Sequence, residues 1–157
     1  MKTAGKKILD ATCGSRMMWF NKQHPDAIYT DKREGVFVAY GNETIVKPDV
    51  KTDFQNLPFD ENSFYLVVFD PPHSKWLGEN TILGQKYGQL FSNWEIEIKQ
   101  GFDECMRVLK PNGTLIFKWN DKDIKLNKLL DVIKVQPLFG HTSGKHGKTI
   151  WLTFMKS

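Results

Sequence analysis

The chain has 157 residues, of which 40% are hydrophobic, 25% charged and 13% aromatic. This length suits one domain, and the composition can bury a core, which excludes a disordered tail, a coiled coil and a collagen-like repeat. No run approaches the roughly 18 apolar residues that a membrane span needs, and the N-terminus shows no apolar signal region. Two cysteines are too few for a disulfide scaffold or a zinc site. We therefore expect a single cytoplasmic domain over residues 1–157, without membrane association.

Positive charge is concentrated in the last third of the chain. The net charge is +4, but residues 1–109 contain 13 Lys and Arg against 15 Asp and Glu, whereas residues 110–157 contain nine against three. A basic segment attracts polyanions, because each phosphate contact releases counterions. A solvated lysine-rich surface would have the same composition. Charge therefore indicates nucleic acid without excluding that alternative.

Short apolar runs alternate with segments of helical spacing along the chain. The predicted strands are residues 7–11, 27–30, 35–40, 43–48, 49–52, 63–69, 114–119, 135–139 and 149–155. The predicted helices are residues 15–22, 94–109 and 124–133. The strands at 35–40 and 43–48 are joined by Gly41-Asn42, which is typical of a hairpin. Because strand and helix alternate, and the run 63–69 is apolar throughout, we expect an α/β sheet with covered faces.

Three aspartates, Asp10, Asp31 and Asp53, stand at the predicted ends of three successive strands. In an open α/β sheet, ligands bind beyond the carboxyl ends of the strands. Gly14 permits close backbone approach after Asp10, and a helix start nearby would offer free N–H groups. Asp31 lies 21 residues after Asp10, a spacing that suits an acid bound to both ribose hydroxyls of a nucleoside-bearing cofactor. Solvated acids at strand ends are the alternative.

The same turn lacks two well-known phosphate-binding patterns. Without G-x-G-x-x-G a dinucleotide is disfavoured, and without G-x-x-x-x-G-K-[ST] P-loop phosphate chemistry is excluded.

Asp70-Pro71-Pro72-His73 follows the strongest predicted strand. Two prolines make a stiff turn and remove two backbone donors, so that carbonyl groups and one carboxylate would face the cleft as acceptors. Such a site suits a substrate that only donates, such as an exocyclic amine. Acceptors on both N–H bonds favour a pyramidal nitrogen, whose lone pair is then available for attack. His73 can stack on a planar base; a simple Pro-Pro strand terminator is the alternative.

Three segments together resemble a known enzyme family. Residues 7–15, KILDATCGS, resemble the cofactor motif of class I S-adenosylmethionine-dependent methyltransferases. Residues 67–73, VVFDPPH, resemble the [DNS]PP[YFWH] motif of enzymes that methylate amino groups of bases. Residues 107–115, RVLKPNGTL, resemble the helix-turn-strand that follows that motif. The chain is most similar to small stand-alone methyltransferases of phages and Gram-positive bacteria.

The resemblance implies a fold and a cofactor. The fold would be Rossmann-like, with a mostly parallel central sheet, helices on both faces and an antiparallel last strand. The cofactor would be S-adenosylmethionine, with Asp10 and the following turn at its amino-acid end, Asp31 on the ribose hydroxyls and Asp53 on the adenine amine. Lys32 would flank the adenine, and Phe54 would pack on its ring. The implied cofactor-binding set is Asp10, Ala11, Thr12, Cys13, Gly14, Asp31, Lys32, Asp53, Phe54 and Asp70.

The resemblance also implies the catalytic set Asp70, Pro71, Pro72 and His73. The Asp70 carboxylate and the Pro71 carbonyl would hold the target amine in line with the methyl group. Transfer would be a direct displacement that needs no metal, with positioning supplying most of the acceleration.

A chain of this length has no room for a separate target-recognition domain. The candidate substrate-binding elements are the loop 75–93, with Trp76 and Tyr87, and the basic segment 141–148, with Lys145 and Lys148. An ordinary hairpin loop is the alternative for the basic segment. A base inside a duplex would have to be flipped out, so a single-stranded or loop substrate is easier. Recognition by a partner subunit, or in a homodimer, stays open.

The predicted function is methyl transfer to the exocyclic amine of a nucleobase in DNA or RNA, adenine N6 ahead of cytosine N4 or guanine N2. One alternative is a methyltransferase of the same fold that acts on a small molecule or a protein, although those branches generally lack Asp70-Pro71-Pro72. Another is a non-catalytic nucleic-acid-binding subunit with a degenerate cofactor site. The single glycine of the first turn allows this last alternative, whereas the retained aspartates speak against it.

Overall fold

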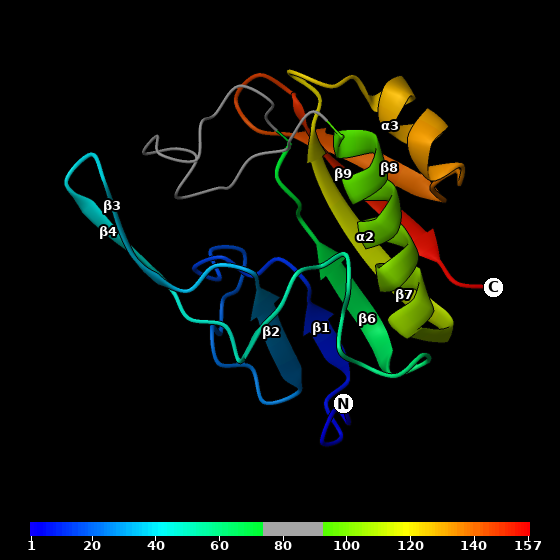
Figure 1. The fold of residues 1–157 in the computed structure, drawn as a ribbon. Coiled ribbons are helices and arrows are strands. Elements are labelled where there is room, and N and C mark those ends of the chain that lie inside the picture. Colours follow the sequence, from blue (N-terminus) through cyan, green and yellow to red (C-terminus); the bar gives the residue numbers. More distant parts are fainter. Residues whose placement is uncertain (74–92) are drawn as a thin grey trace.

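The computed structural model describes residues 1–73 and 93–157. In these residues a seven-stranded sheet has the order β5-β2-β1-β6-β7-β9-β8 (Figure 1). The pairs from β5 to β7 are parallel, and β9 runs antiparallel to both β7 and β8. The expected mostly parallel sheet with an antiparallel last strand is thus confirmed. The strands are β1 (Ile8–Asp10), β2 (Ala27–Asp31), β5 (Val50–Lys51), β6 (Phe64–Phe69), β7 (Leu109–Asn120), β8 (Phe139–Ser143) and β9 (Thr149–Met155).

Helices α2 (Trp94–Val108) and α3 (Leu126–Ile133) pack on one face of this sheet (Figure 1). Side chains of a strand alternate between the two faces, so the fully buried residues of β7 share one face: Leu115, Phe117 and Trp119. Phe102 of α2 and Leu129 of α3 belong to the same buried cluster. Burying one large apolar side chain contributes about 1.5–3 kcal/mol, so this face carries most of the core.

The opposite face of β1 and β2 is covered by an irregular segment, residues 12–26. The predicted helix over 15–22 is wrong, because these residues form turns. Arg16 has a left-handed φ of 60°, which interrupts a right-handed helix. Trp19 packs edge-on against Tyr29, with ring centroids 4.9 Å apart. Within the described residues, the expectation of helices on both faces is therefore corrected to helices on one face.

A separate hairpin of β3 (Gly35–Ala39) and β4 (Asn42–Val46) projects from the body of the molecule (Figure 1). Its turn residues Tyr40 and Gly41 have φ values of 51° and 77°, as a type I′ turn requires. The hairpin is confirmed, but its turn lies one residue earlier than the predicted Gly41-Asn42.

The starts of two strands differ from the sequence prediction. Strand β7 is longer at its start than predicted and includes residues 109–113. The predicted strand at 135–139 is replaced by β8, which starts at Phe139. Strand β8 pairs with β9, with Phe139 opposite Thr153 at one end and Ser143 opposite Thr149 at the other. Close packing against β9 selects this register, because a Cβ at Gly140 would lie 2.9 Å from the Trp151 carbonyl oxygen.

In the described part of the chain, no helix has the length and apolar character of a membrane span.

Candidate functional site

The carboxyl ends of β1, β2 and β6 meet at one edge of the sheet, around a small cavity. Its volume is about 30 Å³, and it is lined by Ala11, Thr12, Asp31, Lys32, Arg33, Phe54, Asp70 and Pro72. All of these except Arg33 were candidate site residues in the sequence. Pockets for small molecules usually measure about 300–1,000 Å³, so this cavity as it stands is too small for a nucleoside.

Arg33 lines the cavity and binds Asp31. The Asp31 carboxylate is 5% exposed and accepts hydrogen bonds from the Arg33 backbone N–H at 2.9 Å, Nε at 3.0 Å and Nη2 at 3.1 Å. It also accepts one from the Gly14 N–H at 2.9 Å. The carboxylate expected to bind ribose is thus held by the chain itself. The sequence signal for this contact was an arginine two residues after the acid that ends the strand.

Asp10 lies behind the first turn and not in the cavity lining. It is fully buried, and its carboxylate accepts hydrogen bonds from the Trp19 indole at 2.7 Å and the Thr12 N–H at 3.2 Å. Burial, together with the charges of Asp70 and Asp31, raises the pKa of Asp10 to about 7 despite these two donors. Asp10 therefore shapes the turn that faces the cavity.

The turn after Asp10 is tied to the strands on both sides of β1. The Cys13 N–H donates to the Thr30 carbonyl at 2.9 Å, and the Thr12 hydroxyl accepts from the Asp70 N–H at 2.7 Å. Cys13 is buried, and burial raises the pKa of its thiol to about 12, so this sulfur is not a nucleophile at neutral pH. The hydrogen bond from Asp70 to Thr12 links the two predicted motifs directly.

Asp70 lies on the face of the sheet opposite to α2 and α3. Its Oδ2 is 3.4 Å from Nζ of Lys118 on β7, a residue that the sequence did not single out. Burial raises the pKa of Asp70, and the Lys118 ammonium partly opposes this rise. Burial lowers the pKa of His73, whose ring lies edge-on to Trp119 with centroids 6.2 Å apart. His73 is therefore neutral at pH 7 and packs against the end of the sheet.

Asp53 and Phe54 differ in their access to the cavity. The Asp53 carboxylate accepts the Gln55 backbone N–H at 2.9 Å and does not line the cavity. Phe54 lines it but is buried, with its ring 5.1 Å from that of Phe69.

The predicted substrate residues fall outside this cavity or outside the described residues. Trp76 and Tyr87 belong to the part of the chain that the structure does not describe. Lys145 and Lys148 are exposed in the connection between β8 and β9. Within residues 1–73 and 93–157, no cluster of three or more His, Cys, Asp or Glu could hold a metal ion.

The donors and acceptors of the site fit a nucleoside-bearing cofactor, with one condition. The two carboxylate oxygens of Asp31, one of which accepts the Gly14 N–H, match a ribose diol, and Phe54 offers an apolar wall. The guanidinium of Arg33 must leave Asp31 before a ribose can take its place.

No protein-family model matches the sequence, and a search of curated proteins finds no match. The fold, in contrast, is shared with many solved structures. The PH0226 protein of Pyrococcus horikoshii has a TM-score of 0.62 at 15% identity, covering 96% of this chain and 82% of that one. A TehB-like SAM-dependent methyltransferase of Corynebacterium glutamicum has a TM-score of 0.59 at 17% identity, covering 98% and 81%. A putative rRNA-methylase of Clostridium thermocellum has a TM-score of 0.55 at 12% identity, covering 98% and 89%.

The chain therefore has the Rossmann-like methyltransferase fold. At these identities the likeness establishes the architecture, and the chemistry has to be argued from the residues of the site.

Proposed function

We propose that this protein, acting as a single domain over residues 1–157, is an S-adenosylmethionine-dependent methyltransferase. Its target is the exocyclic amine of a nucleobase in DNA or RNA, adenine N6 first. One observation carries the proposal: Asp70-Pro71-Pro72 ends β6 beside the cavity that Asp31, at the end of β2, also lines. The Asp70-Pro71-Pro72 turn, which offers hydrogen-bond acceptors, thus lies beside Asp31, an acid placed to bind ribose hydroxyls. Both lie at the edge of the sheet where this fold binds ligands.

The residues of the first turn and of β2 would hold the cofactor. Asp31 would bind its ribose hydroxyls once Arg33 has moved, with the Gly14 N–H holding its carboxylate in place. Lys32 and Phe54 line the cavity where the adenine would lie. When bound, S-adenosylmethionine supplies an electrophilic methyl group.

Asp70 and Pro71 would position the target amine. The carboxylate and the Pro71 carbonyl accept its two N–H bonds, so the nitrogen lone pair points at the methyl group. The amine loses a proton after transfer, and the raised pKa of Asp70 makes this carboxylate a better acceptor for it. Neutral His73 can flank the base without adding charge.

The test is transfer from radiolabelled S-adenosylmethionine to mixed DNA and RNA pools, followed by digestion to nucleosides. We expect label on a methylated adenine nucleoside, and its loss in Asp70→Ala. Asp131→Ala, an exposed aspartate on α3, is the matched control that should keep activity. Label on a small molecule or a protein, with none on either nucleic acid, would contradict the nucleobase target.

A second candidate, a non-catalytic nucleic-acid-binding subunit, is favoured by the Arg33–Asp31 contact, which leaves a cavity of only about 30 Å³. Calorimetry with S-adenosylmethionine separates the two. Binding that Asp31→Ala weakens supports the enzyme, whereas no binding by the wild type or by Arg33→Ala supports the subunit.

A further inference from the structure

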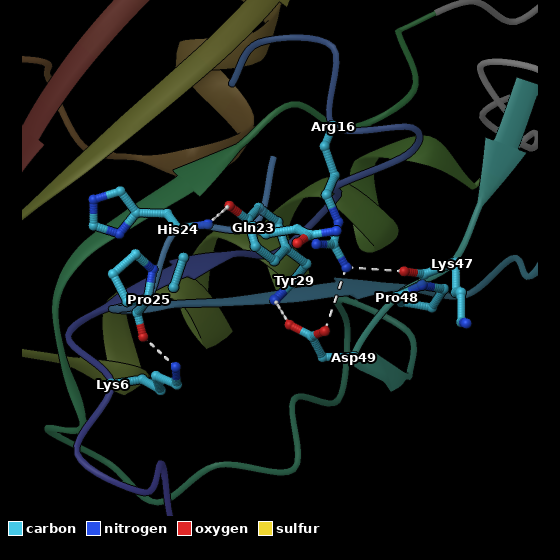
Figure 2. Close-up of a pocket in the computed structure, with 10 residues that line it drawn as sticks. Lys6, Arg16, Gln23, His24, Pro25, Tyr29, Lys47, Pro48 and Asp49 are labelled. Carbon is cyan, nitrogen blue, oxygen red and sulfur yellow. Dashed lines mark hydrogen bonds and ion pairs between the residues drawn. The ribbon is translucent and has the colours of Figure 1, made fainter. Parts of the chain in front are cut away.

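Two adjoining cavities lie over β2 on the face that α2 and α3 leave open. Their volumes are about 380 and 420 Å³, and because they share the lining residues Arg16, Gln23 and Lys47 we treat the two as one trough. Figure 2 shows the first of them. We call this trough the basic groove and define it by Lys6, Arg16, Lys22, Gln23, Lys47 and Asp49.

The basic groove gathers positive charge from separate parts of the chain. Its lining includes four cations, Lys6, Arg16, Lys22 and Lys47, and one carboxylate, Asp49. All five belong to residues 1–109, which carry more acidic than basic side chains. The local excess of positive charge is therefore produced by folding.

Arg16 forms the floor of the basic groove. Its guanidinium lies 3.7 Å from the centroid of the Tyr29 ring and donates to the Lys47 carbonyl oxygen at 2.9 Å (Figure 2). It also donates to the Lys22 carbonyl oxygen at 2.6 Å. It also pairs with Asp49 at 3.3 Å, which neutralises the one carboxylate that the described residues contribute to the groove lining. Arg16 thus fixes the backbone at both lysines.

The side chains of Lys22 and Lys47 face solvent. Lys22 and Lys47 are exposed, and among residues 1–73 and 93–157 neither ammonium group has a hydrogen bond or an ion pair. Lys6, in contrast, donates to the Pro25 carbonyl oxygen. A rigid floor with two available ammonium groups above it suits an anionic ligand that is long enough to reach both cavities.

The basic groove and Asp70 occupy the same face of the sheet. Tyr29 pairs with Asp10, which pairs with Val68, and Asp70 follows two residues later. With strands about 4.8 Å apart and a rise of about 3.3 Å per residue, Asp70 lies about 12 Å from Tyr29. Gly14, in the turn beside the candidate site, lines the near end of the groove.

An exposed aromatic residue stands between two of these cations in the sequence. Phe20, in the irregular segment 12–26 between Arg16 and Lys22, has a relative exposure of 110% and lies outside the lining of both cavities. Cations that follow a backbone, next to aromatic rings on which bases stack, are the combination used to bind single-stranded nucleic acids.

We infer that the basic groove binds the phosphate backbone of a single-stranded nucleic acid and that Phe20 stacks on one of its bases. The inference rests on the proposed function for the class of substrate. It assigns the backbone contacts to Lys22 and Lys47, on the β2 side of Asp70, and not to the Lys145–Lys148 segment.

The test is fluorescence anisotropy with labelled single strands of about 16 nucleotides, RNA and DNA, the largest site size usual for one binding domain. Salt is varied from about 50 to 200 mM. Each phosphate contact in a single strand contributes about 0.7 to the slope of log affinity against log salt, so Lys22→Ala with Lys47→Ala should reduce this slope by about 1.4. At about 0.1 M salt, a slope change of about 1.4 corresponds to roughly a 25-fold loss of affinity in the double variant. Phe20→Ala should weaken binding at least about fivefold with an unchanged slope.

Matched controls separate the groove from a general charge effect. Lys128→Ala changes an exposed lysine on α3, and Phe139→Ala an exposed phenylalanine on β8; both should bind as the wild type does. No binding by the wild type, an unchanged slope in the double variant, or an equal loss in Lys128→Ala would overturn the inference.

The binding assay needs no cofactor and no transfer. Methyl transfer to nucleic acid with groove variants that bind normally would sink the inference alone. Groove-dependent binding without any transfer would sink the proposed function alone.

Discussion

The ammonium group of Lys118 lies 3.4 Å from Oδ2 of Asp70, where β7 runs beside the end of β6. The register explains the contact, because Phe69 pairs with Phe117 and the next residue of each strand points to the same face. The carboxylate proposed to hold the amine therefore faces a fixed positive charge. In the described part of the chain, Asp10 and His73 are the other titratable groups that interact with it.

Replacing Lys118 should shift the pH dependence of methyl transfer. Burial raises the pKa of Asp70 and Lys118 lowers it, so Lys118→Met should raise the pKa further. If the ionised carboxylate is the active form, activity will be lost at a higher pH as the solution is acidified. The pH profile of transfer measures this shift, and Lys118→Arg should restore the wild-type profile. An acid limb that stays in place in Lys118→Met would contradict the assigned role.

Arg33 should compete with the cofactor for Asp31. Removing its guanidinium in Arg33→Ala frees the carboxylate that it now occupies. We expect S-adenosylmethionine to bind about tenfold more tightly, which corresponds to about 1.4 kcal/mol. Calorimetry gives the dissociation constants, and Lys51→Ala, an exposed residue on β5, serves as the control. Weaker binding in Arg33→Ala would instead make Arg33 a ligand of the cofactor.

Gly101 should be indispensable to the packing of α2 on the sheet. A Cβ there would lie 2.5 Å from Cδ2 of Phe54 and 2.8 Å from Cζ of Phe69, both ring atoms of the core. Gly101→Ala should therefore lower the free energy of unfolding by about 1–3 kcal/mol, although alanine favours helix. In a chain of this size each kcal/mol lowers Tm by about 2–4 °C. Thermal unfolding measures the loss, and exposed Gln100→Ala should show none.

Asp10 should make the protein less stable as pH rises through the range from about 4 to 7. Its pKa in the folded state is about 7, above the ordinary value of 3.8, so the folded state binds more protons across this range. The contribution of Asp10 to the free energy of unfolding is fully present below its pKa in the unfolded chain. It is lost as pH rises through its pKa in the folded protein. Its size is at most about 4 kcal/mol. Tm at pH 5 and pH 8 should differ less in Asp10→Asn than in the wild type; an equal difference would show that Asp10 titrates normally.

Local patterns were sufficient for the strands and helices that form the main core. The apolar runs of β1, β6 and β9 and the helical spacing of α2 and α3 are visible in the sequence. Hydrophobic periodicity can be recognised within a segment, without knowing what the segment packs against. The Pro-Pro turn after Asp70 was visible for a similar reason, since proline fixes its own backbone.

Contacts between distant residues decided what the patterns could not. The segment 15–22 has apolar residues enough for a helix, yet the Trp19–Asp10 hydrogen bond and the three contacts of Arg16 hold it as turns. Strand β8 took its register from β9 and not from its own composition. Such contacts depend on the tertiary fold, and the local sequence around one residue does not indicate its partner.

The sequence by itself determined strands β1, β6 and β9, helices α2 and α3, and the two motifs at the sheet edge. Hydrophobic periodicity, proline and glycine constrain the backbone locally, so these features need no distant partner. Only the tertiary structure decided that Arg33 fills the place beside Asp31, that Lys118 faces Asp70, and that four cations meet over β2. The physical reason is that electrostatic and packing energies depend on distances in space, and these are set when the strands come into register.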